Sequence, residues 1–185
     1  MNIKSLVGQL RSRSADARES ALHHIFKVCA GGGLPAELCA PVRDLFRLGP
    51  PWPLTLVLAI CGCPTGDLED AFQEILERGA PFEQARALEY LPMWRDHEDL
   101  LARTRPTVEA LSRAAPPWPA FLASLRRAQL YGAGEEAWHL AAEAVRRAER
   151  GDPRKSIRLQ AEEILTATEH EILAEHLARR ADGEP

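Results

Sequence analysis

The chain has 185 residues, of which 45 % are hydrophobic, and its 23 basic and 27 acidic residues give a net charge of −4. This length and composition fit one folded domain or a short array of repeats, and the charge excludes a general polyanion binder. The uneven spacing of the four cysteines, with no signal-peptide pattern and no apolar run long enough to span a bilayer, favours a cytoplasmic protein with reduced thiols.

Apolar residues recur at helical spacing along the chain and β-branched residues are scarce, so the sequence predicts an all-α fold. A short amphipathic segment over about 1–12 precedes a helix that begins near Ser14 and is ended by the three glycines at 31–33. The later helices are predicted, in order, over about 35–48, 53–61, 67–78, 82–94, 103–114, 117–131 and 135–150, with a capping pair over about 153–181.

One tetrapeptide occurs twice and marks an internal duplication. The residues Pro50-Pro51-Trp52-Pro53 return 66 positions later as Pro116-Pro117-Trp118-Pro119, and the same offset aligns other residues on both sides. The repeat predicts two stacked units, over about 14–79 and 80–150, each made of two antiparallel helix pairs. We interpret the prolines as fixing a turn between helices and each tryptophan as a buried wedge. The alternative is an exposed polyproline ligand with P-x-x-P spacing.

Two stretches carry a further repeat motif: Asp152-Pro153 with Ile157-Arg158 and Ala161, and, more loosely, Asp16 with Ala17-Arg18 and Ala21. This pattern resembles the first helix of a HEAT repeat, although Gln84 replaces the expected arginine in the middle copy. The resemblance implies a single armadillo-like domain over 1–185, a right-handed α-solenoid of about five antiparallel helix pairs. It also implies a protein-binding scaffold more readily than an enzyme.

Acidic residues are concentrated between Pro64 and Asp99, where ten carboxylates and three arginines give a local net charge of −7. On the helix predicted over 67–78, the buried stripe would consist of Leu68, Phe72, Ile75 and Leu76. The opposite face would carry four carboxylates, Asp67, Asp70, Glu74 and Glu77. Like charges at this spacing destabilise a helix by about 0.2–0.5 kcal/mol per pair, so helix stability does not explain the cluster. In a solenoid this helix would line the concave surface, so we expect the four residues to bind a basic partner; an ordinary solvated face is the alternative.

No pattern in the sequence predicts catalysis or a bound cofactor. The cysteines and the pair His23-His24 lack the paired spacing of a zinc module, and cysteines in apolar helices behave as small hydrophobic residues. His170 and His176 are six positions apart and cannot share a metal from one helix face. Phosphate-binding loops, nucleophile elbows and catalytic triads are not recognisable in the sequence. We therefore expect a protein that is not an enzyme and that needs no metal or cofactor.

The sequence thus favours a non-catalytic protein-binding module with a concave, partly acidic face, of which an inhibitor or immunity-type protein for a basic partner is one form. One alternative is a HEAT-like nucleic-acid-binding or base-processing protein, which would use the thin basic edge over 146–158. Another alternative is a structural subunit of a larger assembly.

Overall fold

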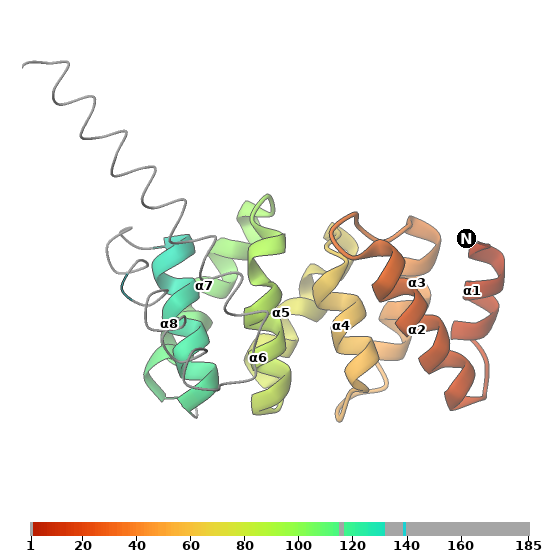
Figure 1. Cartoon of the computed structure of the whole chain (residues 1–185), viewed down its shortest axis with the longest axis horizontal. Helices are drawn as coiled ribbons and strands as arrows, with labels where there is room; N and C mark the ends of the chain where they lie inside the picture. Colours follow the sequence, from red (N-terminus) through yellow and green to blue (C-terminus); the bar gives the residue numbers. More distant parts are fainter. Residues whose placement is uncertain (1, 115–116, 132–138, 140–185) are drawn as a thin grey trace, which may run out of the picture. The chain divides into compact units, whose positions relative to one another are not determined.

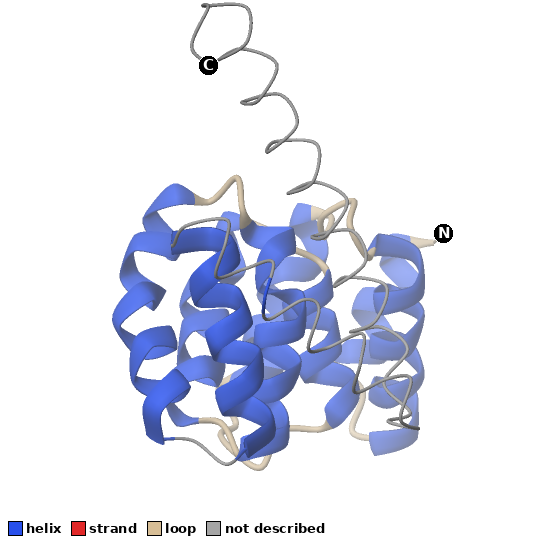
Figure 2. Cartoon of the chain, turned by 60° about the vertical axis from the view of Figure 1, so that its left-hand side comes forward, coloured by secondary structure: helices blue, strands red, loops and turns tan. Residues whose placement is uncertain are grey.

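The computed structural model describes residues 2–114, 117–131 and 139, and these residues form eight α-helices, two 3-10 helices and no strand (Figures 1 and 2). The predicted all-α class is therefore confirmed for this part of the chain. By its contacts the chain divides into two units, residues 1–123 and 124–185. Helices α1 to α7 lie in the first unit, and α8 (Pro117–Tyr131) crosses the boundary. The expected repeat boundary at 79/80 stays a prediction.

The helix boundaries of the first unit follow local signals. Ser14 caps α2 by accepting a hydrogen bond from the backbone N–H of Ala17 at 3.3 Å, as expected for a helix that begins there. Gly31 and Gly33 end it with positive φ angles of 75° and 78°. The elements are α1 Ile3–Leu10, α2 Ala15–Cys29, α3 Ala36–Phe46, α4 Leu54–Gly62, η1 Gly66–Leu68, α5 Glu69–Arg78, α6 Pro81–Tyr90, η2 Leu91–Trp94 and α7 Glu98–Ala114.

Two predicted helices have different bounds in the structure. The segment predicted over 82–94 is α6 followed by the 3-10 helix η2, because Pro92 has no N–H with which to continue the α-helix. Helix α7 begins at Glu98, earlier than the predicted start at Arg103. Glu98 and Asp99 stand in its first turn, where acidic side chains interact favourably with the helix dipole.

The helices of the first unit alternate between two layers. In one layer α2 packs on α4 and α4 on α6, and in the other α1 packs on α3 and α5 on α7. Contacts of α1 with α2, α3 with α4, and α5 with α6 join the layers. Helix α4 therefore contacts four other helices, which explains its run of nine residues without a charge. Its buried positions are Leu56, Val57, Ala59, Ile60, Cys61 and Gly62.

The C-terminal end of α4 is closely packed against α2 and α6. The backbone N–H of Gly31 donates to the carbonyl oxygen of Gly62 at 3.0 Å. A Cβ atom at Gly62 would lie 2.6 Å from Cε2 of Phe26, whose ring meets Tyr90 edge-on at 6.0 Å. The C-terminal ends of α2, α4 and α6 thus lie together, so these three helices run parallel. Their N-terminal ends share the opposite end of the unit.

Trp94 completes this end of the core. Its Nε1–H donates to the carbonyl oxygen of Cys61 at 3.1 Å, and its ring packs 4.7 Å from that of Phe72 in α5. The bond supplies a donor to one of the last carbonyls of α4, which has no partner within its own helix. Trp94 and Cys61 are both buried, so water cannot reach this carbonyl oxygen and the indole N–H is the donor that satisfies it.

Several predicted elements lie outside the described residues. These are the helix over 135–150, the capping pair over 153–181, the motif at Asp152–Ala161, the basic edge over 146–158, and the histidines at 170 and 176. The five-pair solenoid and the 66-residue duplication therefore stay predictions.

Replacing Gly62 by alanine should destabilise the protein by about 1–3 kcal/mol, because the added methyl group overlaps the Phe26 ring. Gly8→Ala is the matched control: nothing lies within 4 Å of the added Cβ in α1, and alanine favours a helix by about 0.5–1 kcal/mol over glycine. Urea unfolding should show shifts of opposite sign for the two variants. Equal shifts would contradict the crowding at Gly62.

Candidate functional site

The four predicted acidic residues lie on the solvent side of η1 and α5, in the layer that also contains α3 and α7 (Figure 1). Asp67, Asp70 and Glu77 are exposed, and Glu74 is half-buried. The predicted buried stripe is confirmed, since its four members are fully buried: Leu68, Phe72, Ile75 and Leu76. The sequence therefore placed the two faces of this helix correctly.

Arginines from both neighbouring helices pair with carboxylates of this segment. Arg43 of α3 donates to Asp67 at 3.2 Å, and Arg103 of α7 donates to Asp70 at 2.9 Å and to Glu69 at 3.1 Å. The hydrogen bond to Asp70 raises the pKa of Arg103, so this guanidinium stays charged at every accessible pH. The ion pairs join three successive helices of one layer, a role that the sequence did not indicate.

The remaining carboxylates of this face interact within α5. Glu74 lies 3.7 Å from Arg78, and Glu77 accepts a hydrogen bond from Gln73 at 2.7 Å. The five carboxylates of the segment 67–77 therefore face three arginines, a difference of 3 − 5 = −2. The negative charge that is prominent in the sequence is partly neutralised by the fold.

His97 contacts the same cluster from the residue before α7. Its Nδ1 lies 2.8 Å from Oε1 of Glu69, and its ring packs 5.1 Å from that of Trp94. Glu69 is thereby held by Arg103 and His97 together, while its own side chain is largely buried. These contacts orient the first turn of α7 against α5.

The four cysteines are free and buried. Burial raises the pKa of Cys63 to about 12 and raises the pKa of the other three thiols as well. Thiols of this kind are poor nucleophiles and poor metal ligands. Over residues 2–114, 117–131 and 139, no three His, Cys, Asp or Glu side chains lie close enough to hold a metal ion.

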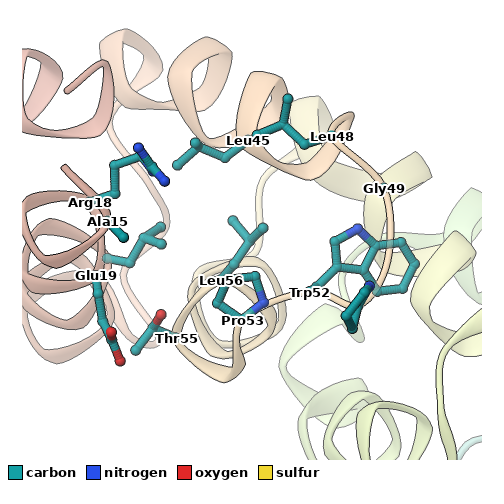
Figure 3. Close-up of a pocket in the computed structure, with 12 residues that line it drawn as sticks. Ala15, Arg18, Glu19, Leu45, Leu48, Gly49, Trp52, Pro53, Thr55 and Leu56 are labelled. Atoms are coloured by element: carbon teal, nitrogen blue, oxygen red, sulfur yellow. The ribbon is translucent and has the colours of Figure 1, made fainter. Parts of the chain in front are cut away.

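A pocket of about 220 Å³ opens at the N-terminal end of α4, beside the first Pro-Pro-Trp-Pro turn (Figure 3). Trp52 closes one side of it and is only 4 % exposed. Its Nε1–H donates to the carbonyl oxygen of Phe46 at 3.1 Å, and its ring stacks on Phe46 at 4.5 Å. The predicted burial is therefore confirmed for Trp52. The apolar lining consists of Ala15, Leu22, Leu45, Leu48, Pro51, Trp52, Pro53 and Leu56.

The second copy of the tetrapeptide is arranged differently. Trp118 is half-buried and stacks on Phe121 at 5.8 Å, within α8. Helix α8 already begins at Pro117, whereas α4 begins only after Pro53. The prediction that both tryptophans are substantially buried thus holds fully for Trp52 and in part for Trp118.

Large apolar side chains are exposed beside the pocket. Leu48 is 79 % exposed and Leu54 is 45 % exposed, on the chain that leads into α4. Phe82, at the start of α6, is 53 % exposed and lies at the same end of the unit. We call the pocket together with Leu48, Pro51 and Leu54 the apolar corner. Sequence reasoning missed it, because Leu54 begins an apolar run that is typical of a core, and Leu48 is a single leucine at a helix end, which does not by itself predict a binding surface.

Arg18 and Glu19 are the charged residues that line the pocket. Arg18 is half-buried, its Nη1 donates to the carbonyl oxygen of Ser12 at 2.7 Å, and no described carboxylate pairs with it. The hydroxyl oxygen of Thr55 is buried in the wall and has no hydrogen-bond partner among the described residues. In Figure 3 the guanidinium of Arg18 lies on the side of Leu45, and Glu19 lies on the side of Thr55. The pocket is therefore mainly apolar, with a cation on one side and a carboxylate on the other.

Comparisons of the chain with protein-family models, with curated proteins and with solved structures found no match. Among the described helices, none has the length and apolar character needed to cross a membrane. The function is therefore inferred from the two surfaces above, the acidic face of α5 and the apolar corner.

The four thiols should resist alkylation in the native protein at about pH 8, because burial both hides them and keeps them protonated. In concentrated guanidinium all four should react. Because folding raises the pKa of these thiols, ionisation favours the unfolded state. The free energy of unfolding should therefore be unaffected below the ordinary thiol pKa of about 8.5 and should fall as the pH rises beyond it. Fast labelling of the native protein, followed by mass spectrometry, would contradict the buried placement.

Arg103→Gln should destabilise the protein by about 0.2–1 kcal/mol, because it removes the cation shared by Glu69 and Asp70 at a largely exposed site. The loss should shrink at high salt, which screens exposed charges. Arg95→Gln is the control, because this exposed arginine makes only a long contact of 4.0 Å, with its sequence neighbour Asp96, and so joins no two helices. Urea unfolding at low and high salt measures both. A loss that salt does not change would mean that Arg103 acts through packing.

Proposed function

We propose that this protein is a non-catalytic protein-binding module, built as an α-solenoid of HEAT-like helix pairs. The alternation of α1 to α7 between two layers supports this architecture, because α1 packs on α3, α2 on α4, α4 on α6 and α5 on α7, as stacked helix pairs do. The 66-residue repeat in the sequence is consistent with the same pattern in a second unit over about 80–150.

The observation that carries the proposal is the apolar corner. Single exposed apolar residues are common, but exposed leucines on the rim of an apolar pocket are typical of a surface that docks a partner. Leu22, Trp52 and Leu56 are core residues that also form the pocket wall, so the pocket is already formed before a partner arrives. A partner side chain could be buried there while Leu48 and Leu54 exclude water around it.

The acidic face of α5 is the second surface of the module. Arg43 and Arg103 already pair with Asp67 and Asp70, so its remaining charge favours attraction and orientation of a basic partner over tight binding. An inhibitor or immunity-type protein acting on a basic target is one form of this module. A permanent subunit of a larger assembly is a second candidate, favoured by the same exposed leucines.

A tagged wild-type chain should capture a partner from its native cell that the double variant L48D/L54D does not capture. Carboxylates at these positions would have to be desolvated in an interface, which weakens binding. Val28→Asp is the matched control, because Val28 is exposed at the opposite, C-terminal end of α2. Circular dichroism verifies that each variant folds. Equal capture by all three proteins would exclude the apolar corner as the interface, and size measurement of the purified complex separates a transient partner from a permanent assembly.

Reversal of the acidic face, with Asp70, Glu74 and Glu77 each replaced by Lys, should slow association with the captured partner about tenfold or more at low salt. The difference should diminish as salt is added. Stopped-flow mixing at several salt concentrations measures this directly. An unchanged association rate would remove the acidic face from the interface.

A further inference from the structure

We infer that the apolar corner binds the C-terminal end of a partner polypeptide, with a large apolar last side chain in the pocket and its carboxylate on Arg18. This inference rests on the proposed protein-binding function and specifies the chemistry of the partner. Four observations support it: the size of the pocket, the guanidinium of Arg18 that pairs with no described carboxylate, the hydroxyl of Thr55, and the exposed leucines at 48 and 54.

The size of the pocket suits one side chain. An apolar cavity of about 150 Å³ admits a benzene ring, so about 220 Å³ admits a leucine, phenylalanine or methionine side chain. Leu22 and Leu56, which line the pocket, belong to the contact between α2 and α4 and are almost completely buried. The walls are thus fixed by the core, and filling the pocket removes apolar surface from water without rearranging the fold.

Arg18 makes the pocket selective for an anion. A guanidinium has five N–H donors, and among the described residues the Arg18 side chain makes one hydrogen bond, from Nη1 to the carbonyl oxygen of Ser12. A half-buried cation beside apolar walls gains most from a carboxylate that accepts two parallel hydrogen bonds. Because Arg18 lines the pocket itself, the carboxylate must be attached close to the anchored side chain. The α-carboxylate of a C-terminal residue meets this condition, since it is bonded to the same Cα atom as the side chain.

Thr55 and the exposed rim favour a polypeptide over a small apolar acid. The buried hydroxyl of Thr55 has no partner among the described residues, and a rotation of this side chain would let it bond to a backbone amide of the bound chain. Leu48 and Leu54 extend the apolar surface beyond the pocket, where only a longer ligand would cover them. Glu19, on the other side of the pocket, is an acceptor suited to a backbone N–H and disfavours a second carboxylate.

The test uses the full chain, labelled with ¹⁵N, and four probes: an acetylated tetrapeptide ending in phenylalanine with a free carboxylate, the same peptide amidated, the same peptide ending in alanine, and octanoate. We expect the free-acid phenylalanine peptide to shift the indole N–H of Trp52 and the backbone N–H of Thr55. It should bind at least about tenfold more tightly than the amidated or the alanine peptide, because each lacks one of the two proposed contacts.

Variants separate the two contacts. Arg18→Gln should abolish the preference for the free acid. Arg18→Lys should keep part of it, because lysine retains the charge but cannot form the bidentate hydrogen bonds of a guanidinium. Arg95→Gln, at the residue that follows η2, should bind as the wild type does. Ala15→Leu should block the pocket, whereas Ala36→Leu should not, although both alanines begin a helix and are exposed.

Three results would overturn the inference: no shift of Trp52 or Thr55 with any peptide, equal affinity of the acid and the amide, or octanoate binding as tightly as the peptide. Failure of the inference can be told from failure of the proposed function. If L48D/L54D loses the captured partner and Arg18→Gln keeps it, the corner is an interface but not a carboxylate site. If peptides bind as expected and no partner depends on the corner, the protein-binding proposal fails.

Discussion

The burial of α4 is the constraint on which the rest of the first unit depends. A nine-residue helix without a charged side chain is stable only if other helices cover most of its surface, and α2, α3, α5 and α6 do so. Its C-terminal carbonyls are then cut off from water and need donors from elsewhere in the chain. Trp94 and Gly31 supply them, and the loss of one such donor leaves a buried carbonyl at a cost of about 1–3 kcal/mol.

The parallel course of α2, α4 and α6 gives the two ends of this layer different properties. At the C-terminal end, glycine and ring contacts leave no room for a ligand, because even a Cβ at Gly62 would meet Phe26. At the N-terminal end, prolines replace capping side chains at the start of α4, and the turn leaves a pocket with Leu48 and Leu54 exposed. Close packing is thus found at one end, and an accessible, preformed surface lies at the other.

The charges of the other layer serve first to hold neighbouring helices together. Four of the five carboxylates along η1 and α5 lie within reach of Arg43, Arg78 or Arg103, and this offsets the repulsion between like charges on one helix face. What remains is a modest negative excess near solvent. Such a field acts on the rate and orientation of association, which is why we assign the tighter contact to the apolar corner.

The sequence by itself determined the helical class, most helix ends, the buried stripe of α5, the central position of α4 and the burial of Trp52. These features depend on local signals, such as helical periodicity, Ser14 and the glycines at 31–33, that act over a few residues. Only the tertiary structure decided that Arg103 pairs with Asp70, 33 positions away, and that Leu48 faces solvent beside a pocket. Pairing and exposure depend on which helices become neighbours, and nothing in the sequence around a leucine tells whether a neighbouring helix will cover it.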